Sequence, residues 1–84
     1  MNTFRLKVIS PDNCFFDGEA VNLSLRAAEG DLAVMAGHIP LVTTVRPCDF
    51  SIETDRGEVL EGRTEGGILN VTTECVTLMS ASFS

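Results

Sequence analysis

The sequence has no long hydrophobic run, no excess of basic residues and no catalytic or nucleotide-binding pattern. No apolar stretch approaches the roughly 20 residues that a membrane-spanning helix needs, and the N-terminus lacks the apolar core of a signal peptide, so we expect no direct membrane insertion. Twelve acidic residues against six basic ones give a net charge of −6. Because this charge repels phosphate backbones, we expect no binding of nucleic acid.

Metal-binding and nucleophilic patterns are also missing. His38 is the only histidine, so a metal site would need acids or thiols beside it. The nearest such groups in the sequence are Glu29, Asp31 and Cys48. Their spacing matches no known ligand pattern, and we expect no metal ion. As a base, His38 could serve Ser10, Cys14 or Cys48 only if the fold brought them together, which nothing in the sequence indicates.

The cysteines and glycines are not arranged for a ligand either. Three cysteines at wide spacings fit neither a disulfide framework nor paired zinc ligands, and we interpret them as ordinary thiols that act as small core hydrophobes. The glycines form no phosphate-binding loop between a strand and a helix. The sequence therefore predicts no cofactor, no small-molecule substrate and no catalytic residue.

The chain is long enough for one domain, residues 1–84, with a modest core. An apolar content of 44% is too high for a disordered chain. Folding must offset the conformational entropy lost on ordering 84 residues. This requires burial of roughly 5,000 Å² of apolar surface, so the expected free energy of unfolding is small. A partner that covers further apolar surface would increase it.

Apolar residues alternate with polar ones along most of the chain, which is the period-two pattern of half-buried strands. No window of eleven or more residues shows the helical spacing. The expected strands lie within residues 4–9, 14–16, 21–26, 32–36, 41–45, 50–53, 59 onward, 69–71 and 76–78. The expected turns are residues 10–13, 17–19, 29–31, 37–40, 55–57, 66–67 and 72–74. We interpret residues 50–59 as a solvated hairpin, and the whole as two stacked antiparallel sheets in an all-β sandwich.

The segment EGDLAVMAGHIPLVTTVRP, residues 29–47, breaks this alternation. Residues 32–36 and 41–42 are apolar at every position, so these strands have no polar face. Either both faces are covered within the domain, or one face is covered by another subunit; the thin core favours the second interpretation. The turn at residues 37–40 would hold His38 at a loop tip, and Glu29 and Asp31 could add a polar rim to such an interface.

Three motifs in order resemble a known family, the N-terminal β-sandwich of the epsilon subunit of F-type ATP synthase. FRLKVISPDNCFFDGEA resembles its opening strand and Ser-Pro-Asp turn, EGDLAVMAGHIPLVTTVRP its Gly-His-x-Pro-Leu-Val signature, and GGILNVTTECVTLM its closing hairpin. The resemblance covers nearly the whole chain. It implies a small antiparallel β-sandwich of about ten short strands in the central rotor stalk, bound to the gamma subunit and to the membrane c-ring.

The resemblance also implies site residues, position by position. Those expected to face the c-ring are Glu29, Gly30, Asp31 and His38. Those expected near the gamma subunit are Ser10, Pro40, Leu41 and Val42. Pro47-Cys48 replaces the more usual Pro-Gly. The sequence stops at Ser84, where most members continue into a helical hairpin, so the inhibition and ATP binding carried by that hairpin are not assigned here.

The function implied is that of a non-catalytic rotor subunit, peripheral to the energy-transducing membrane on its cytoplasmic face. Rigid adhesion to gamma and to the c-ring would help couple proton or sodium flow to ATP synthesis. The alternative is a stand-alone β-sandwich that uses the same loops to bind an unrelated protein.

Overall fold

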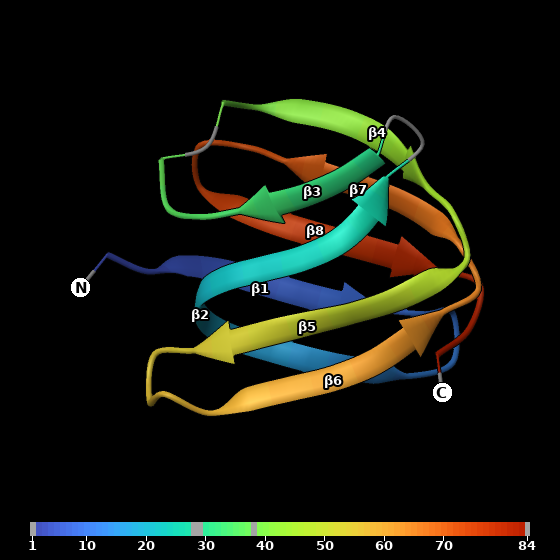
Figure 1. Ribbon diagram of the computed structural model, residues 1–84, viewed down its shortest axis with the longest axis horizontal. Coiled ribbons are helices and arrows are strands. Elements are labelled where there is room, and N and C mark those ends of the chain that lie inside the picture. The colour runs from blue at the N-terminus through green and yellow to red at the C-terminus, as the bar shows by residue number, and fades with distance from the viewer. Residues whose placement is uncertain (1, 28–29, 38, 84) are drawn as a thin grey trace.

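The computed structural model describes residues 2–27, 30–37 and 39–83, and all its regular elements are β-strands. The described residues form eight strands, and Figure 1 shows them arranged around a common interior. They are β1 (Phe4–Ile9), β2 (Cys14–Ala27), β3 (Gly30–Val34), β4 (Leu41–Val45), β5 (Cys48–Thr54), β6 (Val59–Thr64), β7 (Gly67–Val71) and β8 (Cys75–Ser80). The predicted all-β sandwich is confirmed, with eight strands in the described residues where about ten were expected.

The prediction of a turn at Asp17-Gly18-Glu19 is wrong, because β2 runs through these residues as one strand of 14 residues. Its first half pairs with β1 in antiparallel register, with Asp17 opposite Lys7 and Gly18 opposite Leu6. Asp17 also forms an ion pair with Arg5. The ladder to β1 therefore overrides the turn preference of this tripeptide, and two of the expected strands merge into one.

Strand β2 joins two layers. Its first half lies beside β1, and β1, β8, β7 and β4 form one layer in that order. Its second half pairs with β5 and β3, so that β6, β5, β2 and β3 form the other layer (Figure 1). The two predicted sheets are thus one continuous sheet folded over itself. One pairing is parallel, that of β1 with β8, which brings the first and last strands side by side.

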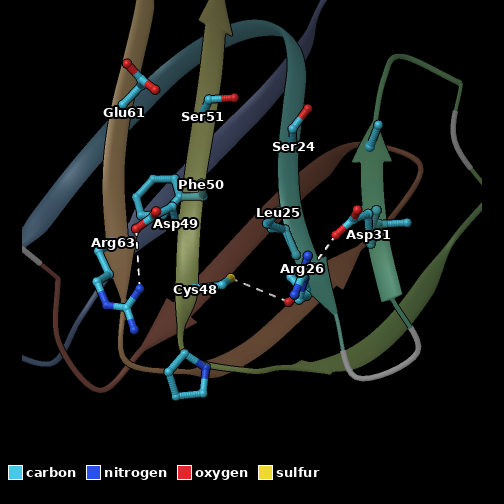
Figure 2. A pocket seen from close by; sticks show the side chains of 13 residues that line it. Ser24, Leu25, Arg26, Asp31, Cys48, Asp49, Phe50, Ser51, Glu61 and Arg63 are labelled. Carbon is cyan, nitrogen blue, oxygen red and sulfur yellow. Dashed lines mark hydrogen bonds and ion pairs between the residues drawn. The ribbon is translucent and has the colours of Figure 1, made fainter.

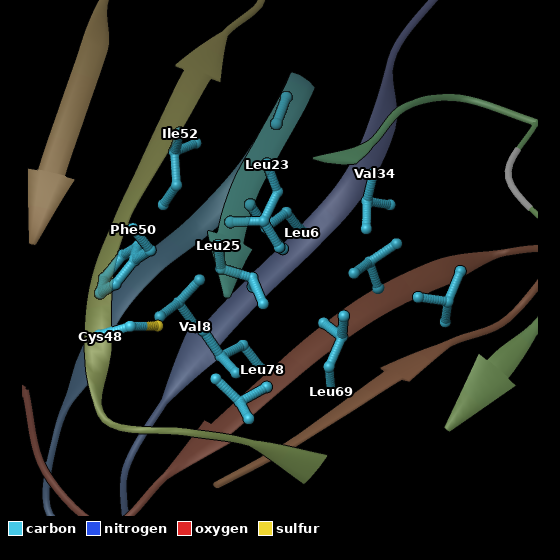
Figure 3. Packing of buried hydrophobic residues seen from close by; sticks show 14 residues of the cluster. Leu6, Val8, Leu23, Leu25, Val34, Cys48, Phe50, Ile52, Leu69 and Leu78 are labelled. Atoms are coloured by element: carbon cyan, nitrogen blue, oxygen red, sulfur yellow. The ribbon is translucent and has the colours of Figure 1, made fainter. Parts of the chain in front are cut away.

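The core lies between the two layers. Figure 3 shows side chains from both layers meeting in the interior. The largest fully buried hydrophobic side chains are Leu6, Val8, Leu23, Val34, Ile52, Leu69 and Leu78. Most occupy the inward positions that the period-two pattern predicts. The interpretation of the cysteines as core residues holds for Cys48 only, since Cys14 is exposed and Cys75 is half-buried.

The predicted hairpin at residues 50–59 is present, but it is not solvated throughout. Strand β5 alternates buried and less buried residues along its length, and Phe50 and Ile52 belong to the core. The turn between β5 and β6 is closed by a hydrogen bond from the Gly57 amide to the Thr54 carbonyl at 3.1 Å. The alternation of Phe50 and Ile52 with polar residues indicates a half-buried strand, of which only the outer face is exposed to solvent.

Two buried hydroxyls tie the end of β6 to the end of β8. Thr64 and Ser80 are hydrogen-bonded to one another through their Oγ atoms. The Gly66 amide donates to Thr64 Oγ1 at 3.1 Å, and Ser80 Oγ donates to the Ser82 carbonyl at 2.8 Å. Each buried hydroxyl therefore has partners, as burial of a polar group requires.

Removing one of these hydroxyls is expected to destabilise the fold. Thr64→Val keeps the side-chain shape but leaves the Gly66 amide without this acceptor and Ser80 without this partner. We expect a loss of about 1–3 kcal/mol in the free energy of unfolding, measured by urea denaturation. Thr44→Val, at an exposed position in β4, is the control and should change it by less than about 0.5 kcal/mol. Equal stability of the two variants would contradict a stabilising role for the buried pair.

Candidate interaction surface

The outer face of the layer formed by β4, β7, β8 and β1 carries two rows of side chains set by strand register. One row runs through Val42, Asn70, Thr77 and Lys7. The next runs through Thr44, Ile68, Met79 and Ile9. Residues opposite one another on neighbouring strands share a face, so these side chains lie next to each other on the side away from the core.

Three large apolar side chains stand out from this face. Val42 is 70% exposed, and Ile68 and Met79 are each 44% exposed. Ile68 lies directly opposite Met79, and Val42 is a diagonal neighbour of Ile68 on the adjoining strand. Single exposed apolar residues are ordinary, but a contiguous group marks an interaction site. We call Val42, Ile68 and Met79, together with Thr44 of β4, the apolar face.

The outer face of the other layer is polar and acidic. A groove of about 730 Å³ lies there over β2, between β3 and β5. Ser24 and Ser51 lie along it (Figure 2). The ladder between β2 and β5 ends at these two serines, and beyond them Cys48 Sγ lies 3.5 Å from the Arg26 carbonyl oxygen. The acids and the bases on this face are Asp31, Asp49, Glu53, Glu61, Arg26 and Arg63.

Two of these acids already have partners. Arg26 is paired with Asp31 at 3.1 Å and Arg63 with Asp49 at 3.4 Å, all four at the surface. Exposed pairs of this kind are solvated and contribute little to stability. In the described part of the chain no three His, Cys, Asp or Glu side chains are grouped to hold a metal ion, nor is there a helix long and apolar enough to cross a membrane.

Of the residues expected at the c-ring, the structure describes Gly30 and Asp31, which lie together at the start of β3. Gly30 begins β3 with a φ of 127°, as the turn preference of glycine predicts, and Asp31 follows it in an exposed position. Gly37 lies beyond the other end of β3. A strand of five residues spans roughly 16 Å, so these two segments occupy opposite ends of the strand. Glu29 and His38 themselves lie outside the described residues.

The residues expected at the gamma subunit occupy different environments. Val42 lies on the apolar face, whereas Leu41 points inward and packs against the core. Pro40 is exposed and lines a second hollow of about 570 Å³ at the β3–β4 loop. Ser10 lies in the turn after β1, where its Oγ accepts a hydrogen bond from the Asn13 amide at 3.1 Å.

The apolar stretch at residues 32–36 is covered on one side only by this domain. Val34 is buried, but Ala33 is exposed and Met35 is 57% exposed. The same holds for β4, where Val45 is buried and Val42 is not. Of the two interpretations of these strands, coverage of both faces within the domain is therefore excluded.

The sequence interpretation missed Ile68 and Met79. Ile68 precedes the buried Leu69, and Met79 follows the buried Leu78. Because side chains alternate between the two faces of a strand, the sequence already placed both residues at outward positions. Their significance depends on the register that places them beside Val42, and that register joins residues far apart in the sequence.

Comparison with known proteins gives the same architecture. Residues 3–84 match the family model described as "ATP synthase, Delta/Epsilon chain, beta-sandwich domain". The chain is 35% identical over 77 residues to the ATP synthase epsilon chain of Clostridium novyi (strain NT), covering 92% of this chain and 59% of that protein. It is 36% identical over 80 residues to the ATP synthase epsilon chain of Delftia acidovorans, covering 95% of this chain and 58% of that protein. The chain thus spans less than two thirds of these relatives.

Solved structures share the fold. A chain in the mitochondrial ATP synthase of Euglena gracilis, in a structure of OSCP, F1 and c-ring, superposes with a TM-score of 0.90 at 21% identity, covering 98% of this chain and 52% of that one. A chain in the central stalk and c-ring of the Tetrahymena thermophila mitochondrial ATP synthase gives a TM-score of 0.82 at 12% identity, covering 99% and 66%. These likenesses show the fold, and the match of residues 3–84 to the family model shows that the chain belongs to the family of ATP synthase delta/epsilon chain β-sandwich domains.

Proposed function

We propose that this domain is a non-catalytic part of the central stalk of an ATP synthase, where it links the gamma subunit to the c-ring and helps couple ion translocation to ATP synthesis. Family membership supports this proposal, and so do the names of the relatives, which are ATP synthase epsilon chains. The domain would then be peripheral to the membrane, on its cytoplasmic face, and would need no cofactor of its own.

The apolar face is the observation that carries the proposal. Val42, Ile68 and Met79 form a contiguous apolar centre, and Asn70, Thr77 and Lys7 give it a polar border on the same layer. An apolar centre within a polar rim is the usual composition of a protein interface. We assign this face to the gamma subunit, because a stalk that transmits torque needs contacts that do not slip.

The other residues expected at gamma have supporting positions around this face. Ser10 directly follows Ile9, which is in register with Met79, and Pro40 precedes β4 at the other end of the layer. Leu41 would act from behind, by holding β4 against the core. We therefore propose Val42 as the direct contact, with Ser10 and Pro40 at its border.

We assign the c-ring contact to the turn before β3. Gly30 and Asp31 are exposed there, and Glu29 precedes them in the sequence. An acidic turn suits a polar loop of a partner and would orient the domain on it. His38, the other residue expected at the c-ring, lies outside the described residues, and its contact with the c-ring stays a prediction.

The test of the proposed function is co-purification with the complex. Membranes are prepared from the source cells, and the epsilon chain is removed from them. Tagged chain is then added, and after detergent extraction it should pull down the gamma subunit and the c-ring. Recovery of neither subunit, from membranes that still contain both, would contradict the proposal and favour a stand-alone binding module.

Charge reversal in the acidic turn tests the c-ring assignment. We expect Asp31→Lys to weaken binding of the gamma-bound domain to isolated c-rings by about tenfold at low salt, with a smaller effect at high salt, because the contact is exposed and screened. The matched control is Glu53→Lys. Glu53 is an exposed acid near the last residue of β5, outside the turn before β3, so this substitution should leave binding to the c-ring unchanged. Equal effects of the two substitutions on c-ring binding would contradict the assignment, because they would show that binding depends on the net charge of the domain and not on the turn before β3.

A further inference from the structure

The last described residues turn back across one end of the sandwich. After β8, residues 81–83 pass beside the β6–β7 connection, and Phe83 makes an isolated antiparallel bridge to Thr64 at the end of β6. We call residues 81–83 the strap. The strap is independent of the apolar face, and the proposed function does not involve it.

The strap lies over a seam in the sandwich that backbone pairing leaves open. In the described residues β6 pairs with β5 on one side, and on its other side only Thr64 is paired, through Phe83. The first half of β2 pairs with β1 and not with β6. The two layers are therefore joined along this seam by side chains.

Aromatic rings fill the seam. Phe15 from β2 and Phe50 from β5 meet edge to face, with ring centroids 5.2 Å apart. Both rings lie over Gly62 of β6, where an added Cβ would approach each ring to 2.9 Å. The glycine thus leaves the space that the two rings occupy.

Phe83 completes this cluster from the strap. Its ring centroid lies 5.6 Å from that of Phe15 and 5.8 Å from that of Phe50, within the range of favourable aromatic pairs. Phe83 is half-buried, whereas Ala81 and Ser82 are exposed. One ring therefore provides most of the apolar contact of the strap.

Besides the bridge between Thr64 and Phe83, four hydrogen bonds among the described residues hold the strap. The Ala81 amide donates to the Gly66 carbonyl at 3.2 Å, and the Glu65 amide donates to the Ser82 carbonyl at 3.2 Å. The Ser82 amide donates to Ser80 Oγ at 3.3 Å, and Ser80 Oγ donates to the Ser82 carbonyl at 2.8 Å. None of these bonds belongs to a ladder between strands, so they can break while the sheet stays paired. Segments with few buried contacts and exposed hydrogen bonds open at lower free energy than the core.

We propose that the strap is a latch that opens independently of the sandwich. In the closed state Phe83 covers Phe15 and Phe50. In the open state both rings lose the cover of Phe83 and Thr64 loses its bridge to it, while the strand ladders stay intact. The domain would thereby have a local two-state element at the end of β8, controlled by one aromatic side chain.

Amide hydrogen exchange by NMR on the full chain tests this latch. The amides of Glu65, Ala81 and Ser82 report on the strap, and those of Leu69 and Leu78, in strands paired on both sides, report on the core. We expect the strap amides to exchange at least about 100-fold faster than the core amides. Equal rates for both groups would overturn the proposal, because they would show that the strap opens only on global unfolding.

Two variants separate a latch from general packing. Phe83→Ala should speed exchange of the strap amides by about tenfold more than that of the core amides, and Phe83→Leu should restore most of the protection. The matched control is Phe4→Ala, which removes another half-buried ring that packs on the core. It should affect core amides more than strap amides. The same pattern of changes in both alanine variants would overturn the latch.

Discussion

Replacing Gly67 with alanine is expected to prevent the sandwich from folding cooperatively. Gly67 is the first residue of β7 and lies between Val45 of β4 and Ser80 of β8. A Cβ at this position would lie 1.9 Å from the carbonyl oxygen of Met79. That atom belongs to the backbone of the neighbouring strand, so it cannot move aside without opening the β7–β8 ladder.

The expected cost is at least about 3 kcal/mol, at the upper end for an overpacked site, because relief of the clash also breaks ladder hydrogen bonds. The midpoint of thermal unfolding, followed by circular dichroism, should fall by more than about 12 °C, or no cooperative transition should remain. Gly18→Ala in β2 is the matched control, since its Cβ would lie 3.4 Å from the Phe16 ring, an ordinary contact. A Gly67→Ala variant as stable as Gly18→Ala would show that β7 and β8 do not pair as closely as described.

Replacing Val42 with aspartate is expected to release the domain from the gamma subunit without unfolding it. Val42 is 70% exposed in the isolated domain, so the new carboxylate stays in water there. In the proposed complex the same carboxylate would be buried at the centre of an apolar contact without a partner, which is costly. Residues at the centre of an interface also contribute most to affinity. We expect affinity for gamma to fall at least about 100-fold, measured by calorimetric titration.

Val59→Asp is the control for this experiment. Val59 is 61% exposed and lies in β6, in the other layer, so the same substitution is made at a similarly exposed valine away from the apolar face. Its affinity for gamma should stay within about twofold of the unmodified domain, and both variants should unfold at similar temperatures. If the two variants bind gamma equally well, the apolar face is not the docking surface.

The period-two pattern locates the strands because inward positions must be apolar to fill the space between the layers. Leu23, Leu25, Phe50 and Ile52 are buried as that pattern predicts. Turn preference failed at Gly18, where the polar residues on either side lie on the outer face of a strand already paired with β1. A local preference worth a fraction of a kcal/mol cannot compete with a complete ladder.

The candidate surface was harder to predict, because it is a property of register. Val42, Ile68 and Met79 belong to three strands, and only the pairing of β4 with β7 and of β7 with β8 brings them together. The distance between Asp31 and Gly37 has a local origin, since residues six apart are near in a loop and far apart along a strand such as β3.

Photo-crosslinking in the assembled synthase tests the central claim most directly. A benzophenone amino acid in place of Val42, in the chain incorporated into the complex, should give one major product with the gamma subunit after irradiation. The same substitution at Val59 should give little or none. A product of position 42 with another subunit, or equal products with gamma from both positions, would contradict docking of the apolar face on gamma.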